Sequence, residues 1–380
     1  MKKVLYCAST VSHIKNFHLP YLKAFKEANY QVWVAVNEKK EIPFSDFVVP
    51  FSFQKKMLSL ANLIAILSVW KLLRREKFDI VSTHTTLASI IVRLAIKLLP
   101  KSKRPQVFHT SHGYLFDDNS RFKKLLYLIP EKLCSSVTNV LMVMNQEDLS
   151  IAQNYKLYRD DIYWIDGMGI PLNRFFPVSG DKKGALREQK GFSEGDFLII
   201  YAAEFSNRKN HLFLIQSFIQ IIMKNIPNAK LLLAGNGQTQ QHCREYVDEY
   251  HANNQIIFLD HVSDMPEYYQ MCDVSVSVSK CEGLPFNVME SMASGIPVIC
   301  SDIKGHRELV DHEESGLLFS VDSYSELGER ILNLYSDPKS KKRYIEKGLL
   351  KISKYKLEEA SKLIFDIYNI NPKGVMGGEE

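Results

Sequence analysis

The chain has 380 residues, more than one hydrophobic core usually serves, so two domains are expected. Its composition, 46% hydrophobic and 24% charged, is typical of a soluble globular protein. Residues 1–175 hold 25 Lys and Arg against 14 Asp and Glu, whereas residues 176–380 hold 23 against 29. The basic half suits an anionic membrane or a pyrophosphate-linked substrate. Nucleic acid is disfavoured as a partner because the chain has no recognisable nucleic-acid motif.

Cysteine spacing and the lengths of the apolar runs favour a cytosolic protein without a membrane span. The six cysteines form no Cys-x-x-Cys pair, which is typical of reduced thiols. The opening apolar run is too short for a secretory signal and predicts a buried strand. The longest charge-free apolar segment, residues 57–70, is shorter than the ~20 residues of a spanning helix.

In the first half, apolar runs that alternate with helical patterns predict strands near 3–8, 31–36, 79–84 and 106–111. The first strand is followed by Ser9-Thr-Val-Ser-His13 and lacks the Gly-x-Gly of a dinucleotide-binding turn. His84 and His112 each end a predicted strand, where parallel sheets bind ligands. His109 alternates inward, and we assign it to the core.

Two segments of the first half combine apolar and basic residues. The helical pattern of residues 57–70 is followed by Lys71, Arg74 and Arg75, and residues 121–126 form a second such segment. A helix of this kind either lies in an anionic interface or packs on its sheet. The excess positive charge of this half favours binding of these segments at an anionic membrane surface over packing on the sheet.

A segment with Gly167, Gly169, Pro171 and Pro177 predicts a hinge between the halves. Beyond it the alternation resumes, with strands predicted near 197–203, 229–234, 255–259, 273–278 and 296–300. This rhythm predicts an α/β fold with parallel sheets and helical crossovers in both halves. Residues on one helical face near the C-terminus predict a last helix; they are Leu357, Ala360, Leu363, Ile364 and Ile367.

Three loops of the second half follow predicted strands. Glu204-Phe-Ser-Asn-Arg208-Lys209 places two cations before a helix. The turn at Gly235 lacks the third glycine of a dinucleotide fingerprint, which argues against NAD. The segment with His261 follows the next strand.

The strand 273–278 runs into Glu282-Gly-Leu-Pro-Phe-Asn-Val-Met-Glu290, a strand-to-helix turn with a carboxylate at each end. Pro285 suits the first helical turn. The N–H groups at the start of this helix and the helix dipole favour a phosphate there. Proline has no N–H, so the donors are Leu284 and Phe286. The turn therefore offers carboxylates that can accept hydrogen bonds from hydroxyl groups, next to backbone N–H groups that can bind an anion. A nucleoside diphosphate sugar is a ligand that needs both.

The string EGLPFNVMESMASGIPVICSDIKGHRELV resembles the donor-binding segment of retaining glycosyltransferases of family 4, which have the GT-B fold and a Glu-x7-Glu pair. The segments TVSHIKNFHLP, TSHGY, VMNQED and FSNRKN are similar to those of the bacterial capsule and exopolysaccharide branch. The resemblance implies two Rossmann-like doubly wound parallel-sheet domains that face one another across a cleft. Residues 1–170 would bind the acceptor and 178–355 the nucleotide sugar. A helix at 356–370 would cross back to the first domain, ahead of a disordered tail at 371–380.

The resemblance also implies residue roles on the donor side. Glu290 would accept hydrogen bonds from ribose hydroxyls and Glu282 from the transferred sugar, both as ionised groups. Lys209 matches the family lysine on the pyrophosphate. The family arginine is replaced by Glu204 here, so Arg208 is the candidate substitute.

Further roles come from the same resemblance. The backbone of Gly283, Leu284 and Phe286 would cradle the phosphate and hexose, and Gly235 and His261 would line the nucleotide. His112 matches a family histidine near the anomeric centre. His84 and His13 are assigned to the acceptor side, and specificity to loops such as residues 115–124.

The activity implied is retaining, metal-independent transfer of a hexose, from a UDP-sugar, to a lipid pyrophosphate-linked glycan at the cytosolic membrane face. No Asp-x-Asp triplet occurs that would hold Mg²⁺ or Mn²⁺ on the donor, and no cofactor is expected. The departing phosphate would take the acceptor's proton. Two alternatives remain: a sugar-nucleotide epimerase of the same architecture, and a non-catalytic partner that binds glycan or nucleotide. The Glu204 replacement keeps the second open, and the presence of Glu282, Glu290 and Lys209 argues against it.

Overall fold

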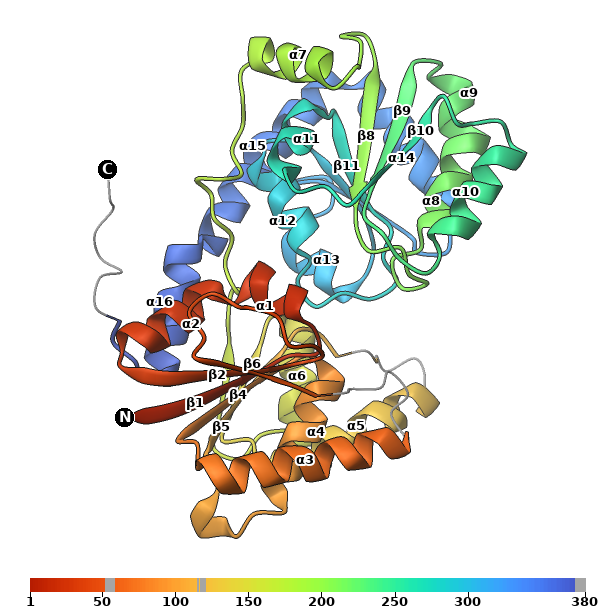
Figure 1. Cartoon of the computed structure of the whole chain (residues 1–380). Coiled ribbons are helices and arrows are strands. Elements are labelled where there is room, and N and C mark those ends of the chain that lie inside the picture. Colours follow the sequence, from red (N-terminus) through yellow and green to blue (C-terminus); the bar gives the residue numbers. More distant parts are fainter. Residues whose placement is uncertain (52–58, 115, 117–120, 373–380) are drawn as a thin grey trace. The chain divides into compact units, whose positions relative to one another are not determined.

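The computed structural model describes residues 1–51, 59–114, 116 and 121–372, apart from the side chains of 121–123 (Figure 1). The chain divides into two compact units, Met1–Gly169 with Glu358–Glu380 (unit 1) and Ile170–Leu357 (unit 2). The expected disorder of the tail falls almost wholly outside the described residues, as does most of the 115–124 loop. No helix of the described part is both long and apolar enough to cross a membrane.

Unit 1 contains a seven-stranded parallel sheet in the order β3-β2-β1-β4-β5-β6-β7. Its strands are β1 (Lys2–Cys7), β2 (Tyr30–Val36), β3 (Phe47–Pro50), β4 (Ile80–His84), β5 (Gln106–Ser111), β6 (Val140–Val143) and β7 (Asp161–Trp164). The four predicted strands are confirmed as β1, β2, β4 and β5, whereas β3, β6 and β7 were not predicted. Chain order reverses between β1 and β4, and parallel α/β sheets usually bind ligands beyond the carboxyl ends of the strands at such a point.

One face of this sheet is covered by α3 (Leu60–Glu76) and α4 (Thr86–Lys97) (Figure 1). Both helices pack on a core that includes Leu5, Val81 and Val107 from neighbouring strands. The predicted helix at 57–70 is therefore present as α3, with its expected first residues outside the described part. The other helices of unit 1 are α1 (Val11–Phe17), α2 (Leu19–Glu27), α5 (Arg121–Ser135), α6 (Gln146–Tyr155) and α16 (Leu357–Tyr368).

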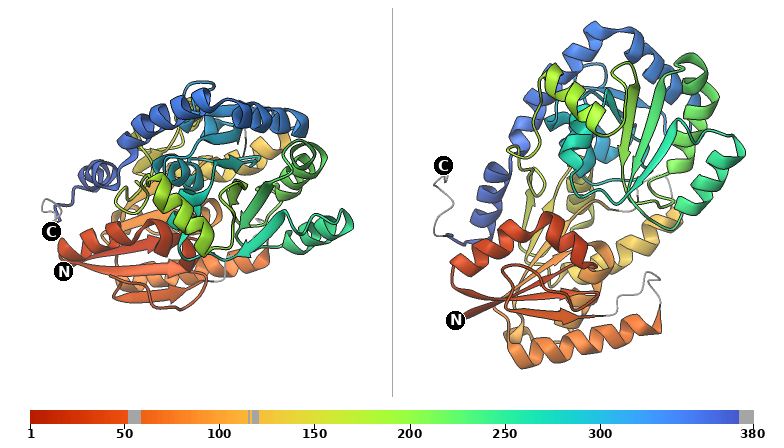
Figure 2. Two further views of the ribbon diagram at one scale, coloured as in Figure 1. Left: turned by 90° about the horizontal axis from the view of Figure 1, so that it is seen from above. Right: turned by 45° about the horizontal axis from the view of Figure 1, so that its top comes forward.

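On the opposite face, α2 and α16 lie side by side although they are far apart in sequence (Figures 1 and 2). The Tyr368 ring lies 5.1 Å from that of Phe25 and 4.5 Å from that of Phe108. The Tyr368 hydroxyl also shares a hydrogen bond of 2.6 Å with Ser82 Oγ. The last helix therefore completes the core of the first sheet.

The buried face of α16 differs from the predicted one. Ala360 and Ile364 are buried as expected, but Leu363 is 39% exposed. Phe365 and Tyr368 are buried instead. The helix is turned so that its aromatic side chains meet those of α2 and the sheet.

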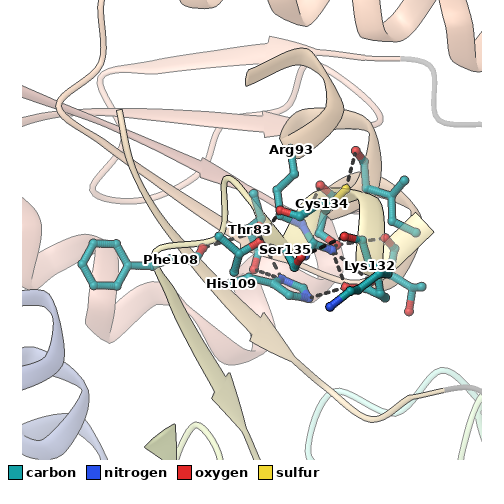
Figure 3. A network of polar contacts seen from close by, with 12 residues as sticks. Thr83, Arg93, Phe108, His109, Lys132, Cys134 and Ser135 are labelled. Carbon is teal, nitrogen blue, oxygen red and sulfur yellow. Dashed lines mark hydrogen bonds and ion pairs between the residues drawn. The ribbon is translucent and has the colours of Figure 1, made fainter. Parts of the chain in front are cut away.

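A buried ion pair joins α4 to α5, and Figure 3 shows the network around it. Arg93 is fully buried, and its Nη2 donates to both carboxylate oxygens of Glu131 at 2.9 Å. Thr138 Oγ1 accepts from Arg93 Nη1 at 3.3 Å. His109 is buried beside this pair, with its Nδ1 3.1 Å from the Thr83 carbonyl oxygen. The assignment of His109 to the core is confirmed.

Unit 2 contains a six-stranded parallel sheet in the order β10-β9-β8-β11-β12-β13. Its strands are β8 (Phe197–Ala202), β9 (Ala229–Ala234), β10 (Ile256–Asp260), β11 (Val274–Ser277), β12 (Val298–Ser301) and β13 (Leu317–Phe319). All but β13 were predicted. Chain order reverses between β8 and β11, so this sheet too has a switch point. The expected α/β fold with two Rossmann-like parallel-sheet domains is confirmed.

Helices cover both faces of the second sheet (Figure 1). Leu214 and Ile331 pack with Tyr201, Leu231 and Val276 in a core beneath α8 and α14. The helices of unit 2 are α7 (Gly180–Gln189), α8 (His211–Ser217), α9 (Met223–Asn225), α10 (Gln240–Glu249), α11 (Met265–Met271), α12 (Phe286–Ala293), α13 (Lys304–Leu309), α14 (Tyr324–Ser336) and α15 (Pro338–Ile352).

Removing the Glu131 carboxylate is expected to destabilise unit 1. Glu131→Ala leaves the buried guanidinium of Arg93 without its counter-ion, which costs about 3–5 kcal/mol of unfolding free energy. Urea unfolding followed by tryptophan fluorescence measures this, because Trp33, Trp70 and Trp164 all belong to unit 1.

The matched control is Glu38→Ala, which removes an exposed ion pair with Lys40 at 3.1 Å in the same unit. Exposed pairs contribute at most about 1 kcal/mol. If Glu131→Ala and Glu38→Ala lowered the unfolding free energy equally, the buried pair with Arg93 would stabilise unit 1 no more than an exposed ion pair does.

Candidate functional site

Glu282 lies in the loop between β11 and α12 and pairs with two cations. Lys209 Nζ lies 2.5 Å from Glu282 Oε1, and Arg208 Nη1 lies 2.9 Å from Oε2. Burial disfavours the ionised carboxylate, but the positive charges of Lys209 and Arg208 outweigh it and lower the pKa of Glu282 to about 2. Glu282 is therefore ionised at neutral pH, as expected.

The switch point of the second sheet brings these residues together. The loops that follow β8 and β11 leave the same edge of the sheet on neighbouring strands. The Lys280 N–H donates to the Arg208 carbonyl at 2.8 Å and joins the two loops. Tyr201, fully buried on β8, donates its hydroxyl to the Lys209 carbonyl at 2.8 Å. The backbone that carries both cations is thus anchored to the sheet.

A second set of buried hydrogen bonds supports the Glu282 loop from β12 and α13. His306 Nδ1 lies 2.7 Å from the Ser301 carbonyl, and its Nε2 lies 2.9 Å from Ser277 Oγ. Since a carbonyl only accepts, Nδ1 carries the proton and Nε2 accepts from the serine. Burial lowers the pKa of His306 to about 4, so the neutral ring persists at neutral pH. Ser301 Oγ donates onward to the Ser279 carbonyl at 2.6 Å.

Gly305 explains how α13 comes so close to this loop. A Cβ built at Gly305 would lie 2.7 Å from the carbonyl oxygens of both Glu282 and Gly283, closer than atoms pack. From the sequence, Gly305 and His306 were recognised only as members of the segment that resembles the donor-binding segment of family 4. Their supporting role had no local signal, because it depends on contacts with Ser277 and Ser301.

Glu290 lies in a different environment on the second turn of α12. Its Oε2 accepts a hydrogen bond of 3.2 Å from the buried hydroxyl of Tyr269. Burial raises the pKa of Glu290 to about 7, and the Tyr269 hydrogen bond and the Arg174 charge offset this only in part. Glu290 therefore loses its proton less readily than an ordinary glutamate, whereas the predicted role uses the ionised carboxylate. Pro285 is also the N-cap in extended conformation, not part of the first turn as predicted.

The Gly235 turn packs against the loop that carries Lys209. Gly235 has φ 135°, and a Cβ there would collide with the Ala203 carbonyl. Its N–H donates to the Asp260 carbonyl at 2.7 Å, which joins this turn to the segment with His261. His261 and Glu204 are both exposed. The close approach of two backbones gives Gly235 a packing reason to be glycine.

In unit 1 the three predicted histidines gather at the carboxyl edge of the first sheet, together with His18. His84 Nδ1 and His112 Nε2 lie 3.2 Å apart. The ring centroid of His13 lies 4.8 Å from that of His112 and 4.9 Å from that of His18. Burial lowers the pKa of His13 to about 4 and lowers the pKa values of the other three well below their usual range. The cluster is therefore neutral at neutral pH.

His18 was not identified from the sequence. It is fully buried, and its Nδ1 lies 3.1 Å from the hydroxyl of Tyr6. The only local signal is its place five residues after His13, in the segment that joins α1 to α2.

Known proteins resemble this chain over nearly its whole length. A family model described as "Glycosyltransferase Family 4" matches residues 21–166, and one described as "Glycosyl transferases group 1" matches residues 182–350. A Bacillus subtilis (strain 168) protein named "Putative glycosyltransferase EpsD" is 32% identical over 369 residues, which are 97% of this chain and 96% of that protein.

A second relative comes from Escherichia coli and is named "UDP-Gal:alpha-D-GlcNAc-diphosphoundecaprenol alpha-1,3-galactosyltransferase". It is 28% identical over 77% of this chain and 75% of its own. Among solved structures, sucrose-phosphate synthase from Thermosynechococcus elongatus has a TM-score of 0.80 at 17% identity, with 97% of this chain and 98% of that chain covered. That likeness concerns the fold.

The raised pKa of Glu290 predicts a pH-dependent effect of Glu290→Gln. A carboxyl group with a raised pKa contributes stability that is complete below about pH 4.5 and is lost as pH rises through about 7. Glutamine keeps the neutral form at every pH. Relative to the wild type, Glu290→Gln should therefore gain about 1–2 kcal/mol in unfolding free energy between about pH 5.5 and about pH 8.5.

Scanning calorimetry at several pH values measures this change, with Glu249→Gln on the exposed face of α10 as the control. A difference from the wild type that stays constant with pH would contradict the raised pKa.

Proposed function

The chain belongs to glycosyltransferase family 4, and from that membership we propose that it transfers a hexose from a UDP-sugar to a lipid pyrophosphate-linked glycan with retention of configuration. The observation that carries the proposal is the pairing of Glu282 with Lys209 and Arg208 at the switch point of unit 2. The name of the Escherichia coli relative supports both the UDP donor and the lipid diphosphate acceptor. Surface polysaccharide synthesis is the process this activity would serve.

The cation pair has capacity left for a diphosphate. Lys209 has three N–H donors, of which one contacts Glu282. Arg208 has five, and its Nη1 donates to Glu282 and to the Cys281 carbonyl at 3.0 Å. Two positive charges face a single carboxylate, so the group keeps a net positive charge. We propose that Arg208 would take the place of the arginine that the family has at the position of Glu204. Glu282 would hold both cations in place and accept a hydrogen bond from a sugar hydroxyl.

We propose that the transfer needs no metal ion, because positively charged groups of the chain would take its place. Charge on the departing diphosphate would be met by Lys209, Arg208 and the N-terminus of α12, which lies beside Leu284. Glu290 would hold the ribose, and ligand binding would favour its ionised form. The leaving phosphate would accept the acceptor's proton, so no enzyme nucleophile is required. Unit 1 would bind the acceptor at the edge where His13 and His84 lie, and His112 beside them would be a catalytic residue near the anomeric centre of the transferred sugar.

Two other functions remain distinguishable by experiment. An epimerase would convert one nucleotide sugar to another without an acceptor, so product analysis separates it from a transferase. A retaining transferase must give a product with the anomeric configuration of the donor. A non-catalytic binding partner is favoured only by the exposed Glu204 in the place of the family arginine.

Nucleotide binding gives the direct test of the donor site. Thermal unfolding with UDP and UDP-sugars should shift upward by mass action, equally with EDTA and with Mg²⁺. Lys209→Met should weaken UDP binding about 10–100-fold, because it removes charge-assisted hydrogen bonds to phosphate. Lys280→Met, on the neighbouring loop with an exposed side chain, is the matched control.

A shift that EDTA abolishes and Mg²⁺ restores would rule out the metal-independent donor site. The absence of a shift with every nucleotide would favour the non-catalytic alternative. Equal binding by Lys209→Met and Lys280→Met would remove Lys209 from the site.

We further propose that unit 1 binds the cytosolic face of an anionic membrane through α3 and α5. Large apolar side chains are exposed on both helices; they are Leu60, Leu63, Ile64 and Leu67 on α3 and Leu125, Ile129 and Leu133 on α5. Lys71, Arg74 and Arg75 are exposed at the end of α3. Apolar residues with adjacent basic ones suit the interface of an anionic bilayer.

Vesicle co-sedimentation tests this surface. The protein should bind phosphatidylglycerol vesicles at low salt and be released as salt screens the attraction. Leu63→Ser with Leu67→Ser should weaken binding about 10-fold or more through lost apolar burial. Leu98→Ser with Leu350→Ser is the control, since those leucines are 57% and 70% exposed elsewhere. Equal binding by both double variants would exclude α3 as the contact.

A further inference from the structure

We propose that unit 1 binds one divalent ion of the zinc class through His13, His18 and His112. One ring nitrogen of each histidine lies within 4.8 Å of those of the other two. Three imidazoles form a ligand set that suits zinc, cobalt, nickel or copper, and they leave a fourth position open for water or another ligand. Two of these ligands, His13 and His112, also belong to the edge where the proposed function places the acceptor, but the test below measures bound metal, so its failure and the failure of the transfer proposal are distinguishable.

Two buried nitrogen atoms of the cluster are available to coordinate an ion. His18 is fully buried, and within the described structure its Nε2 has no hydrogen-bond partner. The Nε2 atom of His13 is likewise inaccessible to solvent and unpartnered. Buried polar side-chain atoms nearly always have a partner. Two such atoms on neighbouring rings are explained together by one ion that both would coordinate.

Hydrogen bonds around the cluster leave lone pairs for the ion. His18 Nδ1 lies 3.1 Å from the Tyr6 hydroxyl, so donation from Nδ1 leaves the lone pair on Nε2. His112 Nε2 lies 3.2 Å from His84 Nδ1, so donation to His84 leaves the lone pair on His112 Nδ1. His84 Nε2 in turn lies 2.9 Å from Ser82 Oγ. Metal-binding histidines are typically oriented by outer partners of this kind.

The rings need a modest adjustment to bind an ion. Tetrahedral zinc with bonds of about 2.0–2.1 Å places its nitrogen ligands about 3.3 Å apart. From separations of up to 4.8 Å, the rings must therefore approach by at most about 1.5 Å. His13 is half-buried on the short helix α1, which makes it the ring best able to move.

The place of the site suggests what it would do. His84 ends β4 and His112 directly follows β5, so the ion would lie at the carboxyl edge of the first sheet. Its open position would accept an oxygen of a bound ligand, such as a phosphate or a hydroxyl. The proposed histidine-bound ion differs from a Mg²⁺ ion bound to the leaving diphosphate, because Mg²⁺ prefers oxygen ligands to imidazole.

The test uses tag-free full-length protein stripped with EDTA and then titrated with Co²⁺ or Zn²⁺. We expect one ion per chain by elemental analysis, and the visible absorption of four-coordinate Co²⁺. His13→Ala and His112→Ala should each weaken Co²⁺ binding by more than about 10-fold. His242→Ala, which removes an exposed histidine on α10, should leave binding unchanged.

Thermal unfolding verifies that each variant is folded, and half-buried His13 is the position most tolerant of change. His18→Asn provides a third ligand variant. Failure of the wild type to bind Co²⁺ or Zn²⁺ stoichiometrically would overturn the proposal. Co²⁺ binding that persists unchanged in His13→Ala and His112→Ala would do the same.

Discussion

Parallel pairing of every strand constrains both sheets, because it places the carboxyl ends of all strands of a sheet on one edge. Chain order reverses between β1 and β4 in unit 1 and between β8 and β11 in unit 2. The loops leaving those strands therefore emerge next to one another. Lys209 and Glu282, 73 residues apart, meet for this reason. His84 and His112 meet because they lie at the carboxyl ends of the neighbouring parallel strands β4 and β5.

The two glutamates of one short segment show how strongly local surroundings control charge. Two cations lower the pKa of Glu282, whereas burial beside the Tyr269 hydroxyl raises the pKa of Glu290. Glu282 is therefore held in its ionised form, whereas the surroundings of Glu290 favour its protonated form more than those of an ordinary glutamate do. A ligand that brings hydroxyl donors to Glu290 would select the charged state.

Strands in the sheet interiors were predictable because long apolar runs mark them. The strands that were missed are short and belong to the outer parts of the sheets, or have few apolar residues. β3 and β7 have exposed or half-buried side chains, and β13 spans only Leu317–Phe319. A run of three residues is too brief for periodicity to separate from a loop. β6 (Val140–Val143) is buried and as long as the predicted β11 and β12, so its length does not explain why it was missed.

The sequence allowed us to predict which residues belong to the candidate sites, but not which side chains contact them. Glu282, Lys209 and Glu290 were chosen on spacing and on family resemblance. Their pKa values depend on Arg208, Tyr269 and burial, which only the fold determines. His18 gave no signal of its own, since an isolated histidine in a helical segment is ordinary.

The contribution of α16 to the first sheet has a consequence for biosynthesis. Ser82 and Tyr368 share a hydrogen bond across 286 positions of the chain, and Tyr368 covers Phe25 and Phe108. As the polypeptide leaves the ribosome, unit 2 has all its strands before unit 1 has its last helix. The first-made half must therefore wait, with part of an apolar face uncovered, until α16 has been synthesised. A nascent chain of this kind offers chaperones a binding surface while the whole of unit 2 is being made.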